Sequence, residues 1–396
     1  MKIVLAPDGF KGSLRAKEVC DSMREGALRA APEAEIVCVP MADGGEGTVR
    51  SLVDALGGSF VFCETEDPIG RRMVSAYAIL SASENNRGAR GMTAIIEMSA
   101  ASGIQLLKER EYAPLRASTR GTGLLIKDAL DRACRNFIIG IGGSATNDGG
   151  AGMAKALGYA LLDAHGNEIP EGGGGLRRLD RIVSRRSDAR LSESRFTVAC
   201  DVNNPLLGPN GASRVFGPQK GATPEMIETL ESGLENFADK CARDLGKELR
   251  DIPGGGAAGG LGAGSVAFLN AELRRGTEIV VDAVGLREKI KGAAFVLTGE
   301  GRADAQTASG KTACGVAGVA KEFGIPVILL AGSLGPGAER LNAYGIDECF
   351  AVMDGTVTFE DAMKNAAPLI AARTEKIVRD RLSRRTGLAP AQKREK

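Results

Sequence analysis

Short runs of aliphatic and β-branched residues alternate with amphipathic helical patterns at both ends of the chain. The alternating pattern predicts strands at residues 3–6, 35–39, 294–297, 326–330 and 349–353. Apolar residues at helical spacing predict helices at residues 13–31, 47–56, 312–323 and 358–381. Strands and helices in this order predict a parallel sheet with helices on both faces.

The middle of the chain has a different pattern. Residues 59–80 hold two extended runs around an Asp-Pro-Ile-Gly turn, which predicts paired strands, and the glycines at 172–175 predict an exposed loop. Further strands are predicted at 93–97, 137–141 and 197–199. We therefore predict two α/β domains. The first is discontinuous, 1–58 plus 290–382; the second, 59–289, is inserted into it, and the basic tail 383–396 is disordered.

Composition excludes several function classes. The 396 residues include 51 Lys and Arg against 50 Asp and Glu, so a strongly basic nucleic-acid binder is not indicated. No apolar run is long enough to cross a bilayer, and the eight cysteines show no CxxC motif. With no secretory pattern at the start, we expect a cytoplasmic protein with reduced thiols. A single histidine, His165, sits in a predicted surface turn and excludes sites that need two imidazoles.

Glycine, with 54 residues, is about twice as common as usual, and four glycine-rich segments follow predicted strands. The first, PDGFKGS at 7–13, puts Asp8 and Lys11 before a helix whose N-terminal amides favour anions. Alternatively, this segment is only a turn in which Ser13 caps the helix.

The second segment, MADGGEGT at 41–48, places Asp43 and Glu46 beside a Gly-Gly turn. Two carboxylates in a turn suit a hydrated Mg²⁺ ion. Alternatively, the two acids are favourable charges at the start of a helix.

The third segment, GIGGSATNDGG at 140–150, combines glycines with side-chain donors. Backbone amides freed by glycine, together with Ser144 and Asn147, predict a phosphate cradle. The same segment matches the dinucleotide fingerprint, with Asp163 about 20 residues later, but a lone match of that kind is weak evidence.

The fourth segment, TGEGRADAQTASGKT at 298–312, resembles a Walker A loop but has Ala305 where that motif needs glycine. Lys311 suits charge neutralisation, and Glu300 and Asp304 suit a metal or a nucleophile. Alternatively, the segment is a polar loop that caps a helix. Asp201 follows another predicted strand, and the glycines of 254–264 predict an ordered turn against a ligand or a neighbouring helix.

Acids, lysines and glycine turns without histidine favour phosphoryl transfer, in which positioning and charge neutralisation do most of the catalysis. Two other functions stay open from the residues alone. One is an NAD(P)-dependent hydroxy-acid dehydrogenase, and the other is a sugar- or nucleotide-sensing binding protein.

Six segments, in order along about residues 1–380, together resemble the bacterial glycerate kinase family, in particular the type that phosphorylates the 2-hydroxyl. They are 7–13, 40–48, 140–150, 200–205 with 216–222, 254–264 and 298–311. The resemblance implies Mg²⁺-assisted, ATP-dependent phosphorylation of D-glycerate to 2-phosphoglycerate, and a flavodoxin-like fold for the discontinuous domain. Gly9 departs from the family pattern, which usually has serine there, so binding of the acid is expected to be weaker or its choice different. A related hydroxy acid as substrate, or 3-phosphoglycerate as product, is the alternative within this class.

Residue roles follow as hypotheses from the resemblance and the residue types. They assign Asp8, Lys11 and Arg71 to glycerate; Gly142, Gly143, Ser144 and Asn147 to the nucleotide phosphates; and Asp43 and Glu46 to Mg²⁺. Asp201 or Asp304 is the candidate base, Lys311 acts on the transferring phosphoryl group, and Lys11 is also counted among the catalytic residues. These loops are expected to meet in one cleft between the domains. No nucleic-acid or membrane partner is expected, and a homodimer is compatible with the sequence.

Overall fold

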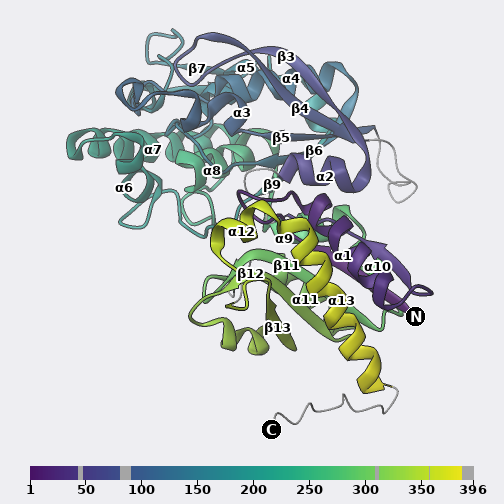
Figure 1. Cartoon of the computed structure of the whole chain (residues 1–396). Helices are drawn as coiled ribbons and strands as arrows, with labels where there is room; N and C mark the ends of the chain where they lie inside the picture. Colours follow the sequence, from purple (N-terminus) through teal and green to yellow (C-terminus); the bar gives the residue numbers. More distant parts are fainter. Residues whose placement is uncertain (43–47, 81–90, 308–311, 356, 386–396) are drawn as a thin grey trace. The chain divides into compact units, whose positions relative to one another are not determined.

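The computed structural model describes residues 1–42, 48–80, 91–307, 312–355 and 357–385 (Figure 1). The chain forms two compact units. Unit 1 comprises Met1–Asp43, Arg50–Ala55 and Val280–Lys396, and unit 2 comprises Gly44–Val49 and Leu56–Ile279. Both ends of the chain therefore belong to one unit, and the middle forms the other.

Unit 1 is built on a five-stranded, fully parallel sheet. Its strands are β1 (Lys2–Pro7), β2 (Glu35–Cys38), β11 (Phe295–Ala303), β12 (Val327–Leu334) and β13 (Glu348–Ala351). The order β2-β1-β11-β12-β13 is the flavodoxin-like order, which confirms the predicted fold class. The chain order reverses between β1 and β11, where ligands bind in folds of this type.

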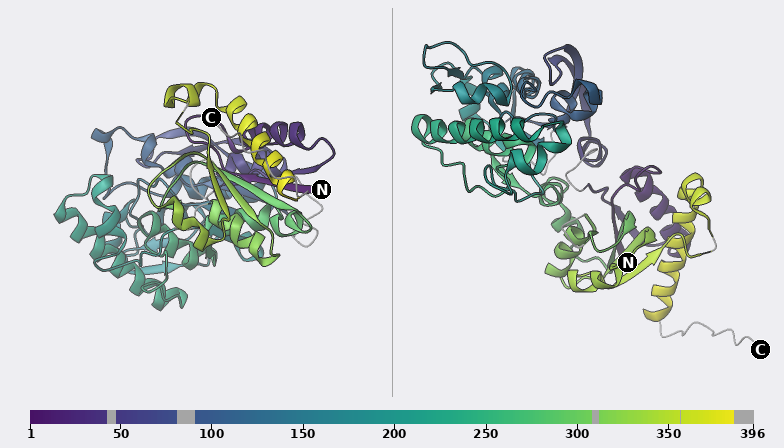
Figure 2. Two further views of the ribbon diagram at one scale, coloured as in Figure 1. Left: turned by 60° about the horizontal axis from the view of Figure 1, so that its bottom comes forward. Right: turned by 90° about the vertical axis from the view of Figure 1, so that its left-hand side faces the viewer.

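Helices α1 (Ala16–Ala30) and α13 (Ala366–Arg385) lie side by side on one face of this sheet (Figures 1 and 2). Ile3 and Leu5 of β1 pack with Met23 and Ile370 in one buried cluster. Strand side chains alternate, so Val4, which is equally buried, lies on the other face. The remaining helices of the unit are α10 (Leu286–Ile290), α11 (Thr312–Glu322), η8 (Ala338–Tyr344) and α12 (Phe359–Lys364), and α9 (Gly276–Ala283) spans the boundary with unit 2.

Two local predictions in unit 1 are wrong. Arg15, not Ser13, stands at the N-terminus of α1, where the Glu18 carboxylate accepts a hydrogen bond from the Arg15 amide at 2.9 Å. The predicted helix at 358–381 is two helices, α12 and α13, because Pro368 has no N–H and its ring clashes with a continuous helix. Helix α13 also continues to Arg385, into the predicted tail, whose remainder lies outside the described residues.

Unit 2 is built on a mixed sheet in the order β10-β9-β6-β5-β4-β3. The paired strands β3 (Gly58–Glu66) and β4 (Arg72–Leu80) are antiparallel, as predicted, and β5, β6, β9 and β10 are parallel. The other strands are β5 (Met92–Glu97), β6 (Cys134–Gly140), β9 (Arg195–Ala199) and β10 (Glu272–Arg274), with the pair β7 (Ala160–Leu162) and β8 (Arg181–Val183) outside the sheet. Its main helices are α3 (Ser99–Ser102), α4 (Arg120–Asp131), α5 (Ala151–Ala156), α6 (Ala212–Phe216), α7 (Pro224–Leu245) and α8 (Ala257–Leu269), and α2 (Thr48–Leu56) spans the unit boundary.

The glycine run at 254–264 is ordered and packs against the loop at 140–150. A Cβ on Gly259 would lie 2.0 Å from the Thr146 carbonyl oxygen, and one on Gly264 would lie 2.1 Å from the Gly149 oxygen. The Gly149 amide donates a hydrogen bond to the Gly259 oxygen at 3.0 Å. Only glycine permits backbones to approach this closely. The run is therefore ordered, as predicted, but most of it belongs to α8, and its close neighbour is the loop at 140–150 rather than a helix.

The glycines at 172–175 do not form the exposed loop that was predicted. They lead into the short helix η4 (Gly173–Arg178), and Gly173 and Gly175 are buried. A Cβ on Gly173 would lie 2.3 Å from the Asn147 carbonyl oxygen, so close backbone contact explains this glycine. Across the described ranges, no helix has both the length and the apolar character needed to cross a membrane.

Candidate functional site

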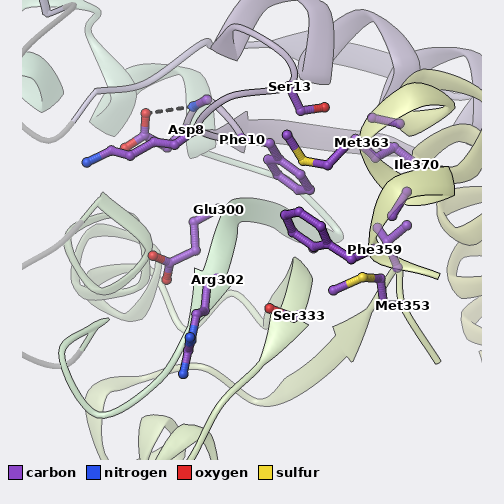
Figure 3. A pocket seen from close by; sticks show the side chains of 17 residues that line it. Asp8, Phe10, Ser13, Glu300, Arg302, Ser333, Met353, Phe359, Met363 and Ile370 are labelled. Carbon is purple, nitrogen blue, oxygen red and sulfur yellow. Dashed lines mark hydrogen bonds between the residues drawn. The ribbon is translucent and has the colours of Figure 1, made fainter. Parts of the chain in front are cut away.

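Unit 1 has a pocket of about 440 Å³ at the carboxyl ends of its strands (Figure 3). The segment after β1, the ends of β11 and β12, and the first residues of α12 and α13 form its walls. Polar lining comes from Asp8, Lys11, Ser13, Glu300, Arg302 and Ser333, and apolar lining includes Phe10, Val352, Met353, Phe359, Met363 and Ile370. The pocket therefore sits at the point where the strand order reverses, and it has both a charged and an apolar wall.

Asp8 is fixed by the strands on which the pocket is built. Its amide donates to the Gly299 oxygen at 2.8 Å, which extends the pairing of β1 with β11. Its carboxylate accepts hydrogen bonds from the Gly9 amide at 2.6 Å and from the Thr312 hydroxyl at 2.6 Å. Asp8 and the buried Glu300 thus present two carboxylates from adjacent strands. Hard oxygen ligands of this kind suit Mg²⁺.

Gly9 lines the same pocket but would direct a side chain elsewhere. A Cβ at this position would lie 3.3 Å from the Leu14 carbonyl oxygen and 3.4 Å from the Ala16 amide nitrogen. A serine here would therefore face the start of α1 rather than open space.

Unit 2 has a second pocket of about 440 Å³, again at the carboxyl ends of parallel strands. The loops after β6 and β9 form two of its walls. Its lining includes Ile141, Gly142, Gly143, Ser144, Cys200, Asp201, Val202, Phe216, Gln219, Lys220 and Ala258. A Cβ on Gly142 would meet no atom within 4 Å, so the backbone there is open to a ligand.

Lys220 is a fully buried ammonium group in the lining of this second pocket. Its Nζ donates to the Ser144 hydroxyl at 2.7 Å and to the Thr146 carbonyl oxygen at 2.6 Å. Both acceptors are neutral, and burial lowers the pKa of Lys220 to about 7, although the charge of Asp148 opposes this. A buried charge is costly unless it is paired, so this arrangement favours an anionic ligand.

Asp148 and Asn147 fix the loop at 140–150, which lines the second pocket, through hydrogen bonds of their buried side chains. The Asp148 carboxylate accepts hydrogen bonds from the Thr119 amide at 2.8 Å, the Thr119 hydroxyl at 2.9 Å and the Gly152 amide at 3.1 Å. Burial raises the pKa of Asp148, whereas these bonds lower it. Asn147 is fully buried, and its Nδ2 donates to the Ser213 hydroxyl at 3.1 Å. Asn147 is therefore part of the framework of the loop and does not line the pocket.

The structure brings some of the candidate residues together and separates others. Asp8 and Lys11 share the unit 1 pocket, and Gly142, Gly143 and Ser144 share the unit 2 pocket with Asp201. The meeting of all these loops in one cleft stays a prediction. Asp43, Glu46 and Lys311 lie outside the described residues.

Arg71 and Asp304 line neither of these pockets. Arg71 binds Asp67 at 2.5 Å and Glu111 at 2.9 Å, which engages the guanidinium group that was assigned to glycerate. Asp304 pairs with Arg302 at 3.3 Å, and its Oδ1 accepts a hydrogen bond from the Gln306 amide.

The dinucleotide fingerprint is not supported by its surroundings. The helix after the loop, α5, begins only at Ala151 and spans six residues, whereas the fingerprint requires a helix that opens within the motif. Asp163 accepts hydrogen bonds from the amides of His165 and Asn167 in its own turn. Its carboxylate is thus used locally rather than presented to a ribose.

Several pocket residues were given no role from the sequence, among them Lys220 and Phe359. Lys220 had a signal, because it lies in the segment FGPQKGA at 216–222 that contributes to the family resemblance. Phe359 had none, because it is an aromatic residue in an ordinary amphipathic helix. Among the described residues, no cluster of three or more His, Cys, Asp or Glu side chains forms a ready-made metal site.

The model of the glycerate kinase family matches residues 3–382. The chain belongs to the glycerate kinase family. As a member it is a kinase, a phosphotransferase enzyme, and the resemblance inferred from the six segments is confirmed.

Its relatives match over nearly their whole length. The chain is 47% identical to a glycerate kinase of Halalkalibacterium halodurans, over 93% of this chain and 95% of the relative. It is also 47% identical to the glycerate 2-kinase of Escherichia coli, over 92% of this chain and 94% of the relative. A solved structure described as glycerate kinase 2 of Salmonella typhimurium superimposes with a TM-score of 0.88, at 47% identity, over 98% of this chain and 99% of the other.

Proposed function

We propose that this protein transfers the γ-phosphoryl group of ATP to the 2-hydroxyl of D-glycerate, with Mg²⁺, and releases ADP and 2-phosphoglycerate. The observation that carries the proposal is the 47% identity to the Escherichia coli glycerate 2-kinase over nearly the whole length of both chains. The two pockets at strand ends support it, since a kinase must hold a nucleotide and an acceptor, both of which are anions.

In the proposed reaction, the oxygen of the 2-hydroxyl attacks the γ-phosphorus, and the bond between that phosphorus and the bridging oxygen breaks toward ADP. The hydroxyl proton passes to a carboxylate and then to solvent. Between the two candidates, Asp201 is favoured, because it lines a pocket while Asp304 pairs with Arg302. Asp201 also accepts a hydrogen bond from the Gly276 amide at 2.9 Å, which orients its carboxylate.

Mg²⁺ would neutralise charge on the nucleotide phosphates when it is bound. Asp8 and Glu300 are the described carboxylates that fit it, since both line the unit 1 pocket and carry hard oxygen donors. Asp43 and Glu46, which the sequence suggests for the same ion, remain candidates beside them. Lys311 would act on the transferring phosphoryl group as a positive charge.

The eight cysteines are all free thiols, which fits the reducing environment of the cytoplasm. We include a cytoplasmic location in the proposal for this reason. The expected partner is a small molecule, D-glycerate, and the family name supports that substrate.

An assay of ADP release tests the proposal. Purified protein with ATP, MgCl₂ and D-glycerate should release ADP only when the acid is present. Replacing ATP with NAD⁺ should give no change in absorbance from NADH. Absence of glycerate-dependent ADP release, or reduction of NAD⁺ instead, would reject the proposed reaction.

A further inference from the structure

The unit 1 pocket has two chemically different ends (Figure 3). Asp8, Glu300 and Arg302 project into one end, and the rings of Phe10 and Phe359 lie at the other, beside Met353 and Met363 (Figure 3). Ionic and apolar groups are therefore separated along the pocket. A ligand that fills it must have an ionic end and an apolar end.

Glycerate does not have this shape. Each of its three carbons carries oxygen, so it has no surface to set against two aromatic rings and two thioethers. The apolar wall is thus unexplained if this pocket takes only the acid.

We propose that the unit 1 pocket binds the nucleotide, with the purine base against Phe359 and the two methionines and the phosphates toward Lys11 and Arg302. This inference rests on the proposed kinase reaction and deepens it. It also reverses the division of substrates suggested by the sequence, which gave Asp8 and Lys11 to the acid and the loop at 142–147 to the phosphates.

The position of the pocket in the sheet supports the proposal. It lies where the strand order reverses between β1 and β11, which is where doubly wound folds bind nucleotides. Phe359 is 69% exposed, so its ring is available to a base from solvent. Stacking of a base on an aromatic ring is favourable for any purine, because every base has a π-face.

The second pocket then takes the acid. Lys220 is buried there between neutral acceptors, and a compact carboxylate would pair with it. Asp201 lines the same pocket and is the proposed proton acceptor. The carboxylate of the acid and its reacting hydroxyl would thus each meet a described residue of unit 2.

A single tryptophan provides a test that needs no turnover. The chain contains no Trp, so Phe359→Trp creates the only indole and keeps a ring in the pocket. Phe62→Trp is a matched control, since Phe62 is also 69% exposed but lies on β3 of unit 2. ADP should change the fluorescence of the Phe359→Trp protein in a saturable way and leave that of the Phe62→Trp protein unchanged, and D-glycerate alone should affect neither.

Calorimetric titration of Phe359→Ala with ADP and with inorganic tripolyphosphate gives a second readout. Loss of the ring should weaken ADP binding about tenfold and leave tripolyphosphate binding unchanged. Phe62→Ala should bind both as the unaltered protein does. Thermal unfolding of each variant verifies that the fold is retained.

Wild-type affinity for ADP in Phe359→Ala, or a Phe359→Trp signal that responds to glycerate and not to ADP, would overturn the inference. Failure of the proposed function looks different, because the unaltered protein would then bind ADP but transfer no phosphoryl group to glycerate.

Discussion

Replacement of Lys220 by methionine removes the buried ammonium group and nearly preserves the volume of the side chain. In the unaltered protein, the pKa of about 7 means that Lys220 changes charge near neutral pH while the pocket is empty. An anion that pairs with Lys220 binds the protonated form, so its affinity should fall as the pH rises above about 7. The charge of Asp148 favours the protonated form of Lys220, and Asp201 is a carboxylate that lines the same pocket.

The magnitude follows from the pKa. The protonated fraction of Lys220 falls from about nine tenths at pH 6 to about one tenth at pH 8, which is about a tenfold change. The KM for D-glycerate, measured with saturating ATP and Mg²⁺, should therefore rise about tenfold over this range. In Lys220→Met the KM should be about 10- to 100-fold higher at pH 6, because a hydrogen bond to a charged group is lost, and it should no longer depend on this titration.

The same group affects stability with a defined sign. In the unfolded chain Lys220 has the ordinary lysine pKa of about 10.5, whereas burial lowers its pKa in the folded protein to about 7. Between these values the unfolded state binds more protons, so the Lys220 contribution makes the ligand-free protein more stable as the pH rises. Urea unfolding at two pH values should show this increase in the unaltered protein and not in Lys220→Met.

Two results would refute the reasoning about Lys220. One is a KM for glycerate in the unaltered protein that does not change between pH 6 and pH 8. The other is a Lys220→Met enzyme whose KM for glycerate and KM for ATP both equal those of the unaltered protein. If Lys220→Met changed only the KM for ATP, glycerate would instead be assigned to the unit 1 pocket.

Three further predictions concern catalysis and packing. Lys311→Ala should lower kcat by about 100-fold or more with an unchanged melting temperature, and unchanged kinetics would remove this lysine from the mechanism. Gly26→Ala should destabilise unit 1 by about 3 kcal/mol in urea unfolding, because the new Cβ would lie 2.0 Å from the Ala371 carbonyl oxygen. Gly318→Ala is the control: its Cβ would meet no atom within 4 Å, so the substitution should be neutral or stabilising. Equal effects of the two substitutions would contradict the close packing at Gly26. Asp148→Asn should cost about 2 kcal/mol or more, since one oxygen that accepts hydrogen bonds becomes a donor; a melting temperature within 1 °C of that of the unaltered protein would argue against it.

The strands of unit 1 could be predicted because a buried parallel strand is a short, continuous apolar run, as in residues 3–6. Resemblance to a known family supplied the flavodoxin-like order, which the strand β11 confirms by pairing with β1 across nearly 300 residues of chain. Errors arose where a local signal competed with tertiary contacts. The glycines at 172–175 resemble a loop in sequence, but Gly173 is required by the backbone of Asn147.

The candidate site was only partly predictable, because some of its residues are set by contacts between distant parts of the chain. Asp8 follows β1 directly, and Ser144 lies in the loop after β6; such positions point to ligands in α/β folds. The buried Lys220 donates a hydrogen bond to Ser144, which lies 76 residues earlier, and no local pattern in the sequence shows such a contact. Arg71 is the converse case. The sequence offers it as a cation for glycerate, but in the fold it forms ion pairs with Asp67 and Glu111.

The identity of the phosphorylated carbon decides whether this enzyme phosphorylates the 2-hydroxyl of D-glycerate. D-Glycerate labelled with ¹³C at carbon 2, incubated with the protein, ATP and Mg²⁺, should yield a product in which carbon 2 couples to ³¹P through one oxygen, with one ADP formed per product. A product with phosphorus attached through the oxygen of carbon 3, or an unchanged spectrum of glycerate, would contradict phosphorylation of the 2-hydroxyl.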